Sequence, residues 1–86
     1  MNELEIGIVI NYYNKISVAA IEITDEAISV GDTLLIYGYY KEVEACVNHM
    51  EINHKSVRKA IKGENVGVRV PEKVRKGDVV CKIVPD

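Results

Sequence analysis

The chain has 86 residues, a net charge of −2, many valines and isoleucines, and no phenylalanine or tryptophan. β-Branched side chains suit a pleated sheet better than a helix, so this composition favours an all-β protein. The length predicts one domain spanning residues 1–86. No apolar run reaches the ~20 residues of a membrane helix, and the acidic start Asn2-Glu3-Leu4-Glu5 differs from a basic signal peptide. We therefore expect a cytoplasmic location and no membrane contact.

Charge is distributed unevenly along the chain. Residues 1–43 hold seven acidic and two basic residues, whereas residues 44–86 hold six acidic and nine basic residues. A solvated surface is the usual origin of such a bias, although the second half is basic enough to form a positive face. Cys46 and Cys81 form no Cys-x-x-Cys motif, so we expect both thiols to be reduced.

Hydrophobic alternation predicts short strands. Residues 4–10 alternate as a first strand, a turn follows over 11–15, and the next strand runs from Ile16 to Ile23. Its apolar phase changes, which predicts a bulge or a sharp twist near Ala19-Ala20-Ile21. Further strands are expected over residues 33–37, 43–52 with a second phase shift, 66–70 and 79–84. A turn at Asn53-His54-Lys55 precedes residues 56–60, which form either a short strand or one helical turn.

One turn motif occurs three times. Residues 28–34, 60–66 and 74–80 all read apolar, two residues, glycine, acid, one residue, apolar. Each glycine is suited to a positive φ, and each motif leads into a predicted strand. We expect Val66, Val68 and Val70 to face the core and Pro71 to end their strand. Six or seven strands with bends predict a small closed barrel, with an open sandwich as the alternative.

Catalytic and metal-binding patterns are weak. The chain has no phosphate-binding P-loop, no nucleophile with a partner base and no acid–base pair at a suitable spacing. Cys46, His49, His54 and Cys81 are the possible zinc ligands, but their spacing matches no zinc motif. We therefore expect no catalytic residue, no metal, no cofactor and no bound nucleotide. Five tyrosines lie near predicted loops, where they either stack on bases or pack over a barrel end.

A set of motifs resembles the second, β-barrel domain of translation elongation factor Tu and its relatives. The segment from Gly63 to Val68 resembles that family's glycine turn and strand, and Val47-Asn48-His49-Met50 resembles the preceding strand. Val30-Gly31-Asp32 and Lys76-Gly77-Asp78 occupy the positions of the flanking turns. The segment from Met50 to Val57 is also similar to Met-x-Ile-x-His-Lys-x-Val in the C-terminal barrel of collagenase-like peptidases.

The resemblance implies a six-stranded Greek-key barrel without the GTPase domain, and it implies a pocket. In the members that bind aminoacyl-tRNA, this barrel helps to hold the acceptor end, and His49, Asn65 and Val66 occupy pocket positions. The chain is thus expected to be a stand-alone, non-catalytic module that binds RNA or a tRNA acceptor end. The alternative is a protein-interaction subunit that docks on a larger enzyme or a ribosome-associated factor. The residues predicted to contact RNA phosphates are Lys55, Arg58, Lys59, Lys62, Arg69, Lys73, Arg75 and Lys76.

Overall fold

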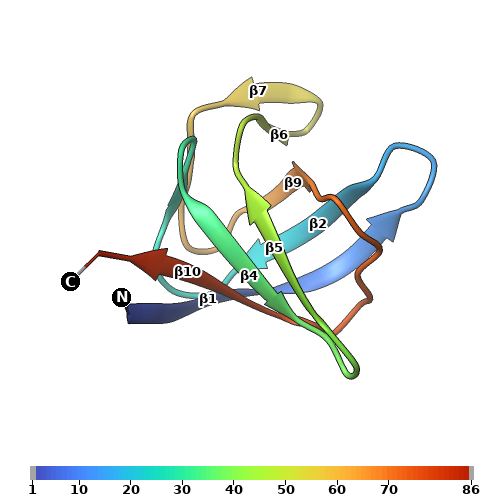
Figure 1. Ribbon diagram of the computed structural model, residues 1–86. Coiled ribbons are helices and arrows are strands. Elements are labelled where there is room, and N and C mark those ends of the chain that lie inside the picture. The colour runs from blue at the N-terminus through green and yellow to red at the C-terminus, as the bar shows by residue number, and fades with distance from the viewer. Residues whose placement is uncertain (1, 86) are drawn as a thin grey trace.

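Ten strands form two antiparallel sheets in the computed structural model, which describes residues 2–85 (Figure 1). The strands are β1 (Asn2–Tyr13), β2 (Val18–Ile23), β3 (Ile28–Ser29), β4 (Thr33–Tyr37), β5 (Glu42–Cys46), β6 (Met50–Ile52), β7 (Lys55–Val57), β8 (Lys59–Ala60), β9 (Asn65–Arg69) and β10 (Val79–Val84). No helix occurs within residues 2–85, which confirms the all-β prediction. No helix in that range therefore has the length and apolarity needed to cross a membrane.

The larger sheet has eight strands in the order β5-β4-β10-β1-β2-β9-β6-β7, and β3 pairs with β8 in a second, two-stranded sheet. Figure 1 shows the larger sheet curling so that β5 passes in front of β2 and β9. Its end strands are β5 and β7, and no backbone ladder joins them within residues 2–85. The prediction of a closed barrel with six or seven strands was therefore wrong in strand number and in closure.

The segment that follows β9 lies across the groove from β5 and does not pair with it. Pro71 has no amide hydrogen to donate to a ladder, so the chain leaves the sheet there. Val70 and Val74 nevertheless remain buried, at 2% and 3% exposure, and cover the core from this side. Lys41 Nζ lies 3.3 Å from Glu72 Oε1 and links the start of β5 to this segment. Side-chain contacts, and no backbone ladder, thus connect the region of β5 to the segment after β9.

A single cluster of buried apolar side chains fills the space enclosed by the strands. Val66, Val68 and Val70 belong to it, as predicted, with exposures of 1%, 1% and 2%. None of residues 2–85 with a polar or charged side chain is buried. Burial of β-branched side chains on alternating strand positions is therefore the main source of stability.

The three predicted turns share one geometry. Gly31, Gly63 and Gly77 have φ values of 101°, 93° and 98°, which confirms the left-handed backbone expected at each glycine. In each turn the acid after the glycine accepts, through its side chain, a hydrogen bond from the amide three residues earlier. These bonds run from Ser29 N to Asp32 Oδ2 at 2.8 Å, from Ile61 N to Glu64 Oε1 at 2.8 Å, and from Arg75 N to Asp78 Oδ2 at 2.9 Å.

Each turn is also fixed to a distant segment of the chain by a pair of backbone hydrogen bonds. The Gly77 amide donates to Val9 O at 2.8 Å, and the Val9 amide donates to Asp78 O at 2.9 Å. Gly31 and Asp32 bond in the same way with Val47, and Gly63 and Glu64 with Ile23. The repeated motif is therefore a device that joins sequence-distant segments, in addition to reversing the chain.

The β1–β2 hairpin differs from its prediction. Residues 11–13 continue β1 rather than forming a turn, and the reversal follows at residues 14–17. A register shift lies opposite Ala20 and Ile21, close to the expected position, but the extra residue is Ile10 on β1. β2 therefore keeps one phase, with Ala19, Ile21 and Ile23 buried and the apolar side chains of Val18 and Ala20 on its other face.

The β6–β7 hairpin turns at Asn53 and His54, whose φ values are 52° and 65°. Two consecutive positive φ values are typical of the tight turn that joins twisted antiparallel strands. The prediction placed Lys55 in the turn, but this residue is the first of β7. The segment over 56–60, predicted as a strand or a helical turn, consists of the end of β7 followed by β8.

Candidate functional site

A groove of about 1200 Å³ opens beside the free side of β5 and continues over β2 and β9. Its lining comes from β1, β2, β5, β6, β9 and the segments between them. Small side chains form part of its floor, since Ala20 of β2 lies opposite Gly67 of β9. A Cβ atom added to Gly67 would lie 3.2 Å from Val18 Cγ1, so this glycine keeps the groove deep. Tyr13 and Ile16, at 49% and 55% exposure, stand at its border.

The predicted pocket residues all border this groove. His49 and Asn65 are exposed, whereas Val66 is 1% exposed and has its side chain in the core. His49 Nε2 lies 2.9 Å from Glu51 Oε2, and this contact holds the imidazole at the groove wall. The structure therefore brings the three predicted positions together, but Val66 contributes to the floor and not to an exposed contact.

The eight predicted RNA-contacting residues are all exposed, but they fall into three groups. Arg69 lies in the groove with the pocket residues. Lys73, Arg75 and Lys76 belong to the segment between β9 and β10. The remaining four lie on β7, on β8 and beside these strands, and they are Lys55, Arg58, Lys59 and Lys62. The sequence could not indicate this separation, because it depends on where distant segments pack.

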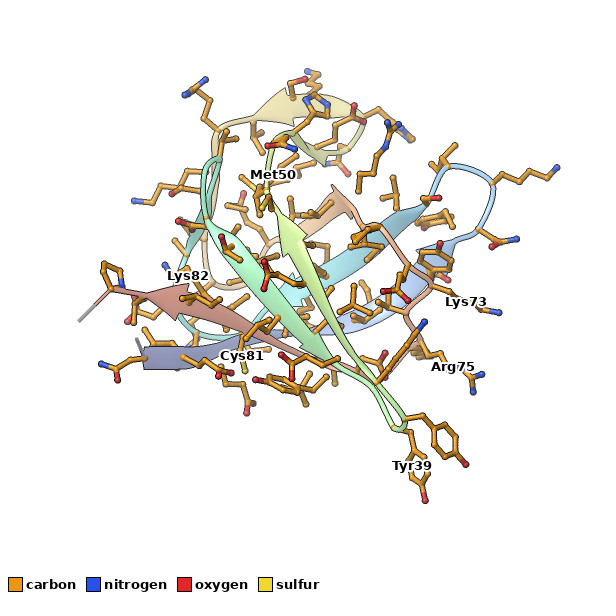
Figure 2. All side chains as sticks on the ribbon, in the orientation of Figure 1. Tyr39, Met50, Lys73, Arg75, Cys81 and Lys82 are labelled. Carbon is orange, nitrogen blue, oxygen red and sulfur yellow. The ribbon has the colours of Figure 1, made fainter. Side chains whose placement is uncertain are left out.

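Two tyrosines project from the tip of the β4–β5 hairpin. Tyr39 and Tyr40 are 89% and 88% exposed, and their ring centroids are 4.6 Å apart in an edge-to-face arrangement. Figure 2 shows Tyr39 pointing away from the strands, with Lys73 and Arg75 on the neighbouring segment. These four side chains share a hollow of about 190 Å³. The tip thus combines exposed aromatic rings with positive charge.

Two side chains on β4 and β10, Tyr37 and Cys81, have raised pKa values. Tyr37 Oη donates a hydrogen bond to Glu3 Oε1. This bond, which favours the neutral phenol, raises the pKa of Tyr37 to about 12. Burial raises the pKa of the Cys81 thiol, and the negative charges of Glu3 and Glu5 raise it further. Sequence patterns gave no sign of this acidic environment, which forms only when β1 and β10 pair.

The possible metal ligands do not converge. Within residues 2–85, no group of three or more histidine, cysteine, aspartate or glutamate side chains is arranged to hold a metal ion. Cys46 is exposed on β5 and Cys81 is partly exposed on β10, and both are free thiols. His49 is engaged with Glu51 as described above.

Comparison with known proteins finds a sequence similarity to part of one protease. A scan against protein-family models gives no match. Over 79 residues the chain is 49% identical to an uncharacterized protease of Methanocaldococcus jannaschii. The match covers 91% of this chain and 19% of the relative, so the chain spans about a fifth of the length of that protein.

Solved structures agree with this comparison at the level of fold. The C-terminal domain of a Geobacillus thermoleovorans U32 peptidase superposes with a TM-score of 0.85 and 13% identity, over 94% of this chain and 93% of that domain. Its selenomethionine variant gives a TM-score of 0.82, also at 13% identity, over 88% and 95%. These matches fit the predicted resemblance to the C-terminal barrel of collagenase-like peptidases. They do not support identification with elongation factor Tu, and they show that this chain has the fold of the U32 peptidase C-terminal domain.

Proposed function

We propose that this chain is a non-catalytic docking module that binds a larger U32-peptidase-like polypeptide. The observation that carries the proposal is the 49% identity to a segment that makes up 19% of the M. jannaschii protease. The fold agrees, because it is that of a C-terminal domain of a U32 peptidase. In such an arrangement the catalytic groups belong to the larger polypeptide, and this domain supplies a binding surface.

The size of the domain is compatible with this role. A standard interface buries roughly 800 Å² on each partner, and the chain exposes 5614 Å². One face of the molecule is therefore large enough for a specific complex, and the rest remains free for solvent.

The experiment uses the M. jannaschii protein with the segment that matches this chain removed. Titration calorimetry with the isolated 86-residue chain should give a one-to-one complex, and light scattering should give the corresponding mass. The isolated chain should not cleave casein or a peptide library. Absence of a complex would overturn the docking function, whereas cleavage by the isolated chain would overturn its non-catalytic character.

RNA binding is a second candidate, supported by the hairpin tip. Tyr39 and Tyr40 expose ring faces and edges, and Lys73 and Arg75 stand beside the same hollow. Aromatic stacking combined with positive charge is a common basis for contact with single-stranded nucleic acid. Fluorescence anisotropy with a labelled single-stranded RNA at low salt tests this candidate, and its expected salt dependence is developed in the Discussion.

A further inference from the structure

One side of β5 is a free sheet edge. β5 pairs with β4, and no strand pairs with its other side within residues 2–85. The hydrogen bond from Val47 N to Asp32 O, at 2.9 Å, fixes which positions bond toward β4, because such positions alternate along an antiparallel strand. The three residues that therefore direct their backbone N–H and C=O groups to the free edge are Glu42, Glu44 and Cys46.

The free edge opens onto the groove. Glu44, Ala45 and Cys46 line one side of it, and Val70 and Pro71 line it from the segment after β9. The floor is apolar here, since Ala45 and Val70 are both 2% exposed and border the groove. An extended peptide beside β5 would therefore find backbone partners along one side and an apolar surface beneath it.

Charge on the outer face defines the chemistry of such a peptide. Glu42 and Glu44 are exposed on this face of the edge strand. The register places Glu44, Leu35, Cys81 and Glu5 in one row across β5, β4, β10 and β1, so carboxylates stand at both ends of an apolar centre. Opposite charges on directly paired strand positions are stabilising, and like charges are destabilising.

This charge pattern disfavours two other occupants. A second copy of the chain paired antiparallel about Glu44 would place two Glu44 carboxylates opposite each other. The phosphates of RNA would meet the same carboxylates and would be repelled. A peptide with lysine or arginine at every second position would instead pair with both glutamates.

Building on the docking function above, we propose that β5 accepts an added strand from the larger polypeptide. The added segment is extended, with basic residues that face Glu42 and Glu44 and small apolar residues that face the groove. Main-chain hydrogen bonds to the free edge supply affinity in this recognition mode, and alternate side chains supply specificity.

The test uses the full 86-residue chain and a defined probe, the peptide Ac-KVKVKV-NH2. We expect binding by NMR titration, with slowed hydrogen exchange at the Glu44 and Cys46 amides. Glu44→Pro removes an edge donor without removing a bond to β4, and Glu44→Lys reverses the charge while keeping the donor. Each variant should weaken binding by about tenfold. Glu26→Lys, an exposed charge reversal in the segment between β2 and β3, is the matched control and should bind as the parent does.

If Glu44→Pro fails to fold, Glu44→Lys still tests the proposal, because it alters only an exposed side chain. Binding of the acidic peptide Ac-EVEVEV-NH2 with equal affinity would overturn the proposal. Equal affinity of the parent and both Glu44 variants would overturn it as well, as would slowed exchange of the Glu44 and Cys46 amides on addition of single-stranded RNA alone.

The truncated M. jannaschii protein separates this inference from the docking function. If this protein binds the parent chain, and its affinity falls about tenfold with Glu44→Lys, both the docking function and strand addition at β5 are supported. If it binds the parent and the Glu44 variants equally, docking stands and strand addition at β5 is overturned. If it does not bind the parent chain at all, the docking function itself fails.

Discussion

Asp78 accepts a hydrogen bond from the amide of Arg75, at 2.9 Å from Arg75 N to Asp78 Oδ2, and so closes the turn that leads into β10. Asp32 and Glu64 do the same for the turns that lead into β4 and β9. The same backbone geometry recurs in all three turns with a carboxylate in the same place. The hydrogen bond of that carboxylate therefore helps to stabilise each turn.

Removing this carboxylate should weaken the fold modestly. Asp78→Ala leaves the Arg75 amide to water, and we expect a loss of about 1 kcal/mol in the free energy of unfolding, since a net hydrogen bond contributes about that much. Urea denaturation followed by circular dichroism measures the change. Asp25→Ala is the control, because Asp25 is exposed and its side chain makes no hydrogen bond to residues 2–85. Equal midpoints for the two variants would contradict the prediction.

The glycines should differ in how they tolerate alanine. A Cβ atom on Gly7 would lie 2.5 Å from Glu22 O, so Gly7→Ala forces β1 and β2 apart. We expect a loss of about 3 kcal/mol or more, at the upper end for overpacking. Gly31→Ala meets nothing within 4 Å but has φ at 101°, so only backbone strain remains, at about 1 kcal/mol. Thermal melts should therefore rank Gly7→Ala below Gly31→Ala, and the reverse order would refute the packing argument.

Val68 tests the dependence of the fold on its core. Val68→Asp places an unpaired carboxylate at a site that is 1% exposed and should unfold the protein, because the expected loss approaches the 5–15 kcal/mol stability typical of a domain. The neighbouring Arg69→Asp, at an exposed position, is the control and should remain folded. One-dimensional NMR distinguishes the two, and dispersed amide signals from Val68→Asp would count against the core assignment.

Sequence reasoning was most successful where the determinant is local. The alternation of Val66, Val68 and Val70 specified a core strand, and the glycine-acid spacing specified three turns, because both depend on neighbours within a few residues. Sheet closure was mispredicted, since no local pattern reveals that the end strands β5 and β7 do not pair. The groove was found only in part: His49 and Asn65 were named through a resemblance, whereas the free edge of β5 depends on how segments distant in sequence pack. The two-residue strands β3 and β8 are too short to show a period.

The hydrogen bond between Tyr37 and Glu3 predicts a pH effect. The pKa of Tyr37 is raised from 10.0 to about 12 in the folded chain, so the stabilisation is complete below pH 10 and is lost as the pH rises through about 12. Replacing the other four tyrosines with phenylalanine leaves Tyr37 as the only phenol, and its ultraviolet titration should show the raised pKa. Glu3→Gln removes the charge and should return the pKa of Tyr37 toward 10. An unchanged titration curve in Glu3→Gln would show that Glu3 is not the cause.

RNA binding at the hairpin tip should depend steeply on salt. Each phosphate contact with a single strand releases roughly 0.7 of a counterion, so affinity should fall sharply between low and physiological salt. Lys73→Glu with Arg75→Glu should weaken binding to all sequences alike, because phosphate contacts carry no direct base information. Lys59→Glu with Lys62→Glu changes the same charge on β8 and the turn after it, and it should have little effect if the tip is the contact. Equal losses in the two double variants would favour the broader basic set predicted from the sequence. Binding that is absent at low salt, or that barely changes with salt, would end the RNA hypothesis and leave the protein partner.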